Sequence, residues 1–132
     1  DGGVNYTAQP KFSAGIREMT NGRGVDLLFD SVGASTWDEN LKCLKLGGRL
    51  IDCGVTGGHR ASIPIGRLFT RGWTIRGSGE RSRREFVEFM ELVHRGKLRG
   101  VVAKIFPLDE AYQAHKTMEA RDFFGKLVLQ IP

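Results

Sequence analysis

Apolar residues along this chain alternate between two kinds of spacing. Short apolar runs are typical of buried strands, and apolar residues that recur every three or four positions are typical of amphipathic helices. The runs predict strands at 25–30, 49–53, 73–76, 101–106 and 126–131, and a very short one at 4–6. The helical spacing predicts helices at 11–20, 36–46, 82–94 and 109–120, with a short connecting segment at 63–70.

Start and stop signals support these helices. Asn21-Gly22 ends the first helix, and Gly47-Gly48 is expected to end the second. Ser82 followed by Glu85 forms a capping-box pattern, and Asp109 is expected to cap the last helix. Because strands separated by single helices pair in parallel through right-handed crossovers, the sequence predicts a layered α/β sheet. The strand at 25–30 is expected to be mostly buried on both sides.

Composition and charge narrow the class of protein. The 132 residues are 40% hydrophobic, enough for one domain with a real core. The net charge is +5, and its densest run, Arg81–Arg84, is interleaved with Glu80 and Glu85, which favours a solvated helix start over a nucleic-acid patch. No apolar run approaches the roughly 20 residues of a membrane span. The first residues lack the pattern of a signal peptide.

Cys43 and Cys53 are the two cysteines of the sequence. They form no CxxC motif and have no nearby histidine pair, so neither a zinc site nor a disulfide framework is predicted. We expect Cys43 on a helix face and Cys53 in a buried strand. Reduced thiols of this kind favour a cytoplasmic protein.

Glycine-containing corners follow three of the predicted strands. In open parallel sheets, ligands bind beyond the carboxyl ends of the strands. That rule selects Ser31-Val32-Gly33, Gly54-Val55-Thr56-Gly57 and Gly77-Ser78-Gly79. A single glycine corner is usually only a turn. Three in succession should line one rim of the sheet and form a candidate binding site.

The third corner also approaches a dinucleotide-binding fingerprint over Gly77–Ser82, with Ser82 in the place of the third glycine. Glu80 would put a negative charge at the helix N-terminus that should face a phosphate. No second strand ends in an acidic residue at the expected spacing. The segment is therefore not predicted to bind a pyrophosphate.

No catalytic constellation is found. His59, His94 and His115 are dispersed, and the last two are expected to lie exposed on helices. Asp30, at a strand end, would either meet a ligand hydroxyl or cap the adjoining turn. Lys126, after a glycine at a strand entrance, would either meet a phosphate or belong to a turn. The spacing leaves both choices open.

Four segments together resemble the zinc-type, medium-chain alcohol dehydrogenase and quinone oxidoreductase superfamily. They are GRGVDLLFDSVG (22–33), LGGRLIDCG (46–54), FPLDEA (106–111) and RDFFGKLVL (121–129). The resemblance implies a doubly wound sheet in the order 3-2-1-4-5-6. Residues 4–6 look like strand 3, and 25–30, 49–53 and 73–77 look like strands 4, 5 and 6. The expected fold is thus a partial Rossmann-type parallel sheet that lacks its first two strands.

The same resemblance implies a division of the chain and a reaction. Residues 1–100 look like the later part of an NAD(P)-binding domain, and residues 101–132 look like a return toward a catalytic domain that is absent. The complete enzyme would transfer hydride between NAD(P)H and a carbonyl, alcohol or activated alkene. This chain alone would be inactive. Zinc would belong to the full-length protein and would not be bound by these residues.

Cofactor-binding residues follow from the resemblance at the strand corners. One group would border the adenosine–ribose side of NAD or NADP: Ser31, Val32 and Gly33. A second group would approach the nicotinamide end: Cys53, Gly54, Val55, Gly77 and Ser78. Lys126 would lie near the pyrophosphate. The resemblance leaves the choice between NAD and NADP open.

A sheet without strand 1 leaves the strand at 25–30 with an unpaired edge. We expect the first segment to rearrange over that edge, or the chain to self-associate and cover it. The strand near 73–77 could also pair across a twofold axis, so a homo-oligomer is expected.

Two other functions stay open from the sequence. One is an enoyl-reductase module of a larger synthase, which shares the superfamily fold. The other is a non-catalytic α/β binding module for anionic partners, which a failure of the full-length protein to bind cofactor would favour.

Overall fold

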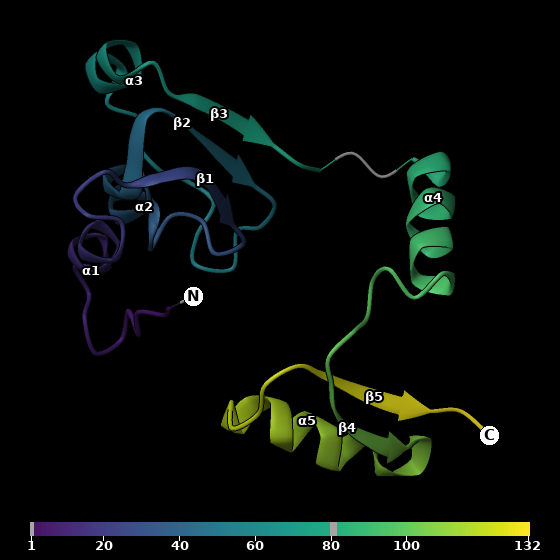
Figure 1. Ribbon diagram of the computed structural model, residues 1–132. Coiled ribbons are helices and arrows are strands. Elements are labelled where there is room, and N and C mark those ends of the chain that lie inside the picture. The colour runs from purple at the N-terminus through teal and green to yellow at the C-terminus, as the bar shows by residue number, and fades with distance from the viewer. Residues whose placement is uncertain (1, 80–81) are drawn as a thin grey trace. The chain divides into compact units, whose positions relative to one another are not determined.

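The computed structural model describes residues 2–79 and 82–132 (Figure 1). The chain divides into two compact units, Asp1–Glu80 and Arg81–Pro132. Each unit has its own parallel strands. The resemblance seen in the sequence assigns residues 1–100 and 101–132 to different domains of a complete enzyme. That assignment is separate from the division into two units, and it stays a prediction.

The first unit is a three-stranded parallel sheet with helices. Its elements are α1 (Phe12–Met19), β1 (Val25–Asp30), α2 (Trp37–Cys43), β2 (Leu44–Asp52), α3 (Ile65–Arg71) and β3 (Thr74–Gly77). The strands lie in the order β1-β2-β3, all parallel (Figure 1). This order is that of strands 4, 5 and 6 in a doubly wound sheet. The prediction of a partial Rossmann-type sheet is confirmed.

The core of this unit lies on one face of the sheet. The four residues of its buried cluster come from α2 and β2: Trp37, Leu41, Leu44 and Leu50. Leu28 and Ile75 pair with Leu50 from either side and pack against this cluster. Leu27 and Phe29, on the opposite face of β1, are 50% and 66% exposed. The prediction that this strand is buried on both sides was therefore wrong, because one of its faces is left open.

The second helix ends earlier than predicted. Leu44 takes an extended conformation and begins β2, where it pairs with Val25. The Arg17 guanidinium explains this end, because it donates hydrogen bonds to the Lys42 carbonyl at 2.9 and 3.1 Å and to the Leu44 carbonyl at 3.0 Å. Gly47 then has a φ of +69°, in the irregular stretch before the regular pairing resumes at Arg49.

The first segment forms no strand. Residues 4–6 have no ladder pairing, so the predicted strand 3 was wrong. Val4 and Tyr6 instead border an apolar groove of about 400 Å³ beside β1. Among the described residues β1 pairs with β2 alone, and its other edge carries no strand. The first segment has therefore not rearranged into a strand over this edge, and self-association there stays a prediction.

The second unit contains α4 (Arg83–His94), β4 (Val102–Pro107), a 3-10 turn η1 (Leu108–Glu110), α5 (Ala111–Ala120) and β5 (Lys126–Gln130). β4 and β5 are parallel, and α5 contacts both. Phe106 and Ala114 are buried in this unit. Asp109 lies inside η1 and Glu110 is the N-cap residue of α5, without a side-chain cap, so the prediction that Asp109 caps this helix was wrong.

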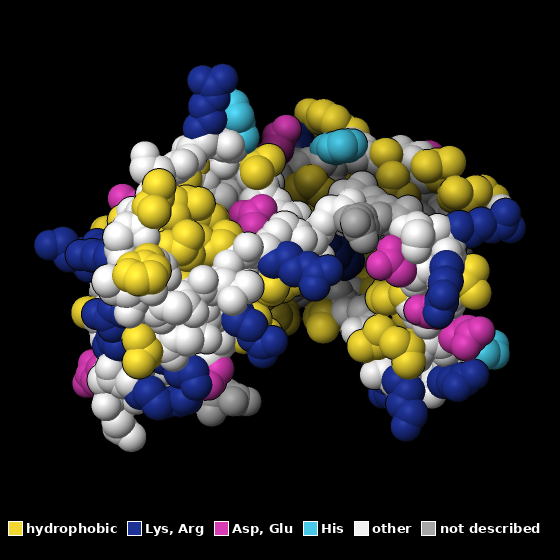
Figure 2. Space-filling view, turned by 90° about the horizontal axis from the view of Figure 1, so that it is seen from above, with side chains coloured by type: hydrophobic (Ala, Val, Ile, Leu, Met, Phe, Trp, Pro, Cys, Tyr) yellow, Lys and Arg dark blue, Asp and Glu magenta, His cyan; other side chains and the backbone are white. Residues whose placement is uncertain are grey.

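The capping box predicted for α4 is confirmed. The Glu85 amide donates to the Ser82 hydroxyl at 3.1 Å, and the Ser82 amide donates to the Glu85 carboxylate at 2.9 Å. Glu80 and Arg81, which belong to the predicted solvated start and to the near-fingerprint, lie outside the described residues. Within each unit, the side seen in Figure 2 carries basic side chains at several separate places among hydrophobic ones.

Candidate functional site

The three glycine corners lie together at the carboxyl ends of β1, β2 and β3. Asp30, Asp52 and Gly77 are the last residues of these strands, and the register places them side by side. The Cys53 amide donates to the Asp30 carbonyl at 2.8 Å, and the Ser78 amide donates to the Asp52 carbonyl at 2.7 Å. The structure thus brings the predicted corners onto one rim of the sheet. We call residues 31–35, 53–58 and 77–79 the rim.

Hydrogen bonds between backbones join the first two corners. The Gly57 amide donates to the Val32 carbonyl at 2.6 Å, and the Ser35 amide donates back to the Gly57 carbonyl at 3.1 Å. The Ala34 amide donates to the Gly58 carbonyl at 3.0 Å. These contacts hold the two loops as one piece, which the sequence pattern did not predict.

Two glycines allow the loops to approach this closely. A Cβ at Gly54 would lie 2.5 Å from the Ser31 carbonyl oxygen. Gly33 has a φ of +88°, and its Cβ would lie 2.6 Å from the Gly58 carbonyl oxygen. A side chain at either position would push the loops apart, so both glycines serve close backbone approach.

The rim presents exposed groups to solvent. Ser31, Cys53, Gly77 and Ser78 are exposed, and Val55 is 57% exposed. Among the described residues of the first unit, a Cβ at Gly77 or at Gly79 would meet nothing within 4 Å. The prediction that Cys53 lies in a buried strand was wrong, because β2 ends one residue earlier at Asp52.

Asp30 supports the turn at the first corner. Asp30 is 3% exposed, and its carboxylate accepts hydrogen bonds from the backbone amides of Val32 at 2.8 Å and Gly33 at 3.2 Å. Of the two interpretations left open by the sequence, this geometry supports the one in which Asp30 caps the adjoining turn.

Thr36 and Asn40 are buried polar residues that the sequence pattern did not reveal. They are 8% and 6% exposed, and the side-chain amide of Asn40 donates a hydrogen bond to the Thr36 hydroxyl at 3.2 Å. The Thr36 hydroxyl in turn donates to the Gly33 carbonyl at 3.2 Å. Their spacing of four residues on a helical segment is the signal that could have revealed this pair.

Lys126 belongs to the second unit, and its approach to the rim of the first unit stays a prediction. It opens β5, is exposed, and its amide donates to the Val101 carbonyl at 2.7 Å. Gly125 has a φ of +119°, and its Cβ would lie 2.6 Å from the Val101 carbonyl oxygen. These contacts support the turn interpretation of Gly125-Lys126, and a contact of Lys126 with phosphate stays a prediction.

Metal ligands do not gather in the described parts. Within residues 2–79 and 82–132, no three His, Cys, Asp or Glu side chains lie together as they would around a metal ion. His59, His94 and His115 are exposed, as predicted for the last two. Cys43 is buried, and desolvation raises the pKa of its thiol to about 11. The described residues thus hold no arrangement that fits a zinc site, and zinc in a complete protein stays a prediction.

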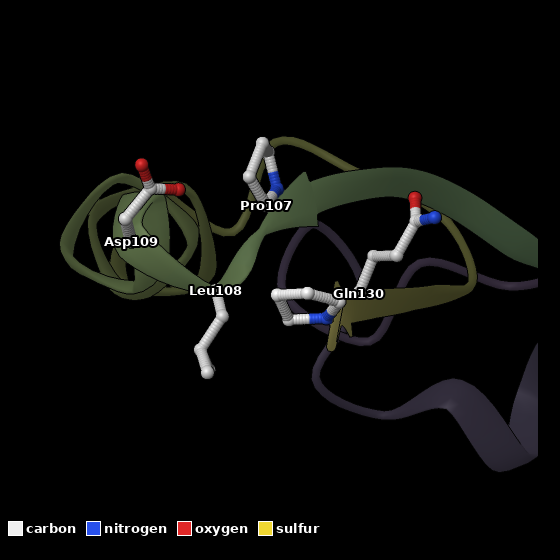
Figure 3. A pocket seen from close by; sticks show the side chains of 5 residues that line it. Pro107, Leu108, Asp109 and Gln130 are labelled. Atoms are coloured by element: carbon white, nitrogen blue, oxygen red, sulfur yellow. The ribbon is translucent and has the colours of Figure 1, made fainter.

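A separate hollow of about 600 Å³ lies in the second unit, at the ends of β4 and β5 (Figure 3). Its lining consists of Pro107, Leu108, Asp109, Gln130 and Pro132. Asp109 is the one ionisable side chain in this lining, so the hollow has no nucleophile–base pair.

In the part of the chain that the structure describes, no helix has the length and apolar composition needed to cross a membrane.

A parallel sheet with glycine corners at the carboxyl ends of its strands is typical of open α/β proteins, which bind their ligands at those ends. A family model described as zinc-binding dehydrogenase matches residues 1–129, and the chain belongs to this family. It is thereby a member of the medium-chain dehydrogenase/reductase superfamily, as the resemblance predicted.

Curated relatives carry several names. The chain is 33% identical to an NAD-dependent alcohol dehydrogenase of Sulfolobus acidocaldarius, over 98% of this chain and 38% of the relative. It is 34% identical to a 2-haloacrylate reductase of a Burkholderia species, over 96% of this chain and 40% of the relative. It is 30% identical to quinone oxidoreductase 1 of Escherichia coli, over 96% of this chain and 42% of the relative. The chain thus spans about two fifths of the length of these relatives.

Solved structures agree with the fold. The crystal structure of an alcohol dehydrogenase from Aeropyrum pernix matches with a TM-score of 0.80 at 32% identity, over 98% of this chain and 36% of that one. The crystal structure of an NAD-dependent alcohol dehydrogenase matches with a TM-score of 0.79 at 34% identity, over 98% and 37% of the two chains.

Proposed function

We propose that this chain is the cofactor-binding portion of an NAD(P)(H)-dependent oxidoreductase that resembles alcohol dehydrogenases and quinone reductases. The observation that carries the proposal is the rim, where three parallel strands end side by side and their corners face solvent. Family membership supports a nicotinamide cofactor as the ligand of this rim. The complete protein would transfer hydride, and the residues described here would be inactive alone.

The residues of the rim would bind and orient the cofactor. Ser31, Val32 and Gly33 would border its adenosine–ribose side. Cys53, Gly54, Val55, Gly77 and Ser78 would approach its nicotinamide end, and Lys126 would lie near the pyrophosphate. The nicotinamide group would accept or donate the hydride when bound. The backbone bonds between the first two corners would keep that part of the rim rigid, so that binding requires little ordering of the protein.

Reduction of an activated alkene is a second candidate reaction. The 2-haloacrylate reductase is as similar to this chain as the NAD-dependent alcohol dehydrogenase is, at 34% against 33% identity. Substrate groups would come from parts of a complete enzyme outside residues 1–132. The cofactor portion would therefore serve either reaction, and NAD and NADP are both proposed as cofactors.

A titration with NADH and with NADPH tests the proposed function. The complete protein is titrated with each cofactor while nicotinamide fluorescence or binding heat is followed, and residues 1–132 alone serve as the comparison. Micromolar binding by the complete protein, about 8 kcal/mol, is expected for one of the two cofactors. Millimolar or absent binding by residues 1–132 is expected. Failure of the complete protein to bind either cofactor would favour a non-catalytic binding module.

The assembly and the compartment are also proposals. The edge strand β3 supports a homo-oligomer, and in residues 1–132 alone the edge of β1 that carries no strand supports self-association. The two free cysteines support a cytoplasmic location. Neither nucleic acid nor a membrane is proposed as a partner of the protein.

A further inference from the structure

We infer that Asp30 is a positioning residue of the proposed cofactor site, whose buried carboxylate shapes the Ser31–Gly33 corner and keeps phosphate out of it. This inference rests on the proposed function. It adds a role for a residue that lies behind the rim, and it names the chemical groups that the first corner rejects.

The contacts of Asp30 reach both interlocked corners. Oδ1 accepts from the amides of Val32 at 2.8 Å and Gly33 at 3.2 Å, and Oδ2 also lies 3.3 Å from the Gly33 nitrogen. The Asp30 carbonyl accepts from the Cys53 amide at 2.8 Å. The carboxylate therefore fixes the first corner, and the backbone of the same residue fixes the start of the second.

The next turn holds the same corner from its other side. The Gly33 carbonyl accepts a hydrogen bond from the Thr36 hydroxyl at 3.2 Å. That hydroxyl in turn accepts a hydrogen bond from the side-chain amide of Asn40, also at 3.2 Å. Gly33 thus has its amide and its carbonyl bound by buried side chains. Because glycine has access to many backbone conformations, this double anchoring restricts the corner to the one with a φ of +88° at Gly33.

Two neighbouring peptide amides that point at one spot form an anion-binding concavity. Phosphate groups commonly occupy such concavities, because peptide amides are strong donors to negative charge. Here the concavity is filled by the carboxylate of Asp30, which is 3% exposed. The corner therefore offers these amides to no ligand, and its fixed negative charge repels a phosphate. The exposed Ser31 can still meet a neutral hydroxyl-bearing part of the cofactor.

The experiment compares Asp30→Ala and Asp30→Asn in the complete enzyme, with Asp38→Ala as the matched control. Asp38 is an exposed carboxylate in the first turn of α2. Steady-state kinetics give kcat and the KM of the cofactor, with and without added formate or inorganic phosphate. Formate can replace the lost carboxylate, whereas phosphate can occupy the same two amides only if they are freed.

Asp30→Ala is expected to raise the KM of the cofactor by about tenfold, with kcat within a factor of about two. Formate should lower that KM again, and phosphate should become a competitive inhibitor against the cofactor. Asp30→Asn retains an acceptor oxygen and should stay within about twofold of the wild type. If the Ala variant does not fold, Asp30→Ser takes its place with the same expectations for formate and phosphate.

The inference is overturned if the Ala or Ser variant loses thermal stability while its cofactor KM is unchanged, or if formate and phosphate act on it as on the wild type. A merely structural role would give that result. Absence of NADH and NADPH binding by the wild type would overturn the proposed function itself, and the inference with it. The wild-type titration therefore separates the two failures.

Discussion

The close approach of Gly54 to the first corner predicts that Gly54→Ala destabilises the first unit. The new Cβ would lie 2.5 Å from the Ser31 carbonyl oxygen and 3.1 Å from the Ser31 carbonyl carbon, whereas real Cβ contacts hardly ever fall below 3.0 Å. Both contacts are with backbone, so no side-chain rotation relieves them. The two corners must separate by about 0.5 Å to reach even the shortest tolerated contact.

That separation stretches the hydrogen bonds on either side of the contact. The Cys53 amide to Asp30 carbonyl bond of 2.8 Å and the Gly57 amide to Val32 carbonyl bond of 2.6 Å both span the two loops. Overpacking of a well-packed site costs about 1–3 kcal/mol. We therefore expect Gly54→Ala to lower the free energy of unfolding by about 2 kcal/mol.

Urea unfolding of residues 1–132, followed by tryptophan fluorescence, measures this change. Both tryptophans, Trp37 and Trp73, belong to the first unit and contribute to its core. Gly66→Ala is the matched control, because Gly66 is in α3 and its Cβ would meet nothing within 4 Å. The control should gain up to about 1 kcal/mol from helix propensity. A Gly54→Ala variant within about 0.3 kcal/mol of the wild type would refute the steric argument.

Three further predictions concern other parts of the first unit. Hydrogen bonds from Arg23 and Lys45 lower the pKa of Asp26 from 3.8 to about 2, so Asp26→Asn should be less stable than the wild type above about pH 4, and this difference should vanish as the pH falls from about 4 to 2; a difference in urea midpoints that stays constant over this range would contradict the prediction. Cys53 should react with a thiol reagent in the folded protein and Cys43 only on unfolding, and equal labelling rates would show that the Cys43 site is open. Leu50 is 0% exposed, so Leu50→Ala should cost about 2–5 kcal/mol in the same urea assay, and a loss under about 1 kcal/mol would show that the core has collapsed around the gap.

The strands and helices could be predicted wherever local spacing decides the structure. The helix at 82–94 and its capping box could be predicted from neighbouring residues alone, and α4 confirms both. The end of α2 depends on the Arg17 guanidinium, which binds the Lys42 and Leu44 carbonyls from 25 and 27 residues away. No local pattern contains such a contact, so the predicted helix ran on to Gly47-Gly48.

The candidate site could be predicted as a set of positions but not as a geometry. Glycine after a strand indicates a corner, and the parallel topology places the three corners on one rim. The joining of the corners depends on which amide of one loop faces which carbonyl of the other. That pairing is fixed by Gly54 and by the register of β1 with β2. Burial was also mispredicted for Leu27 and Phe29, because an apolar side chain does not reveal whether another layer covers it.

The hydrogen bonds of Arg17 set a limit on how this protein can be divided for expression. Its guanidinium joins carbonyl groups of Gly22 and Arg23, which precede β1, to those of Lys42 and Leu44, at the junction of α2 with β2. A fragment that begins at β1 would leave these carbonyl groups without their donor. A fragment that keeps these hydrogen bonds must therefore retain Arg17, and a boundary placed upstream of Phe12 retains the whole of α1 with it.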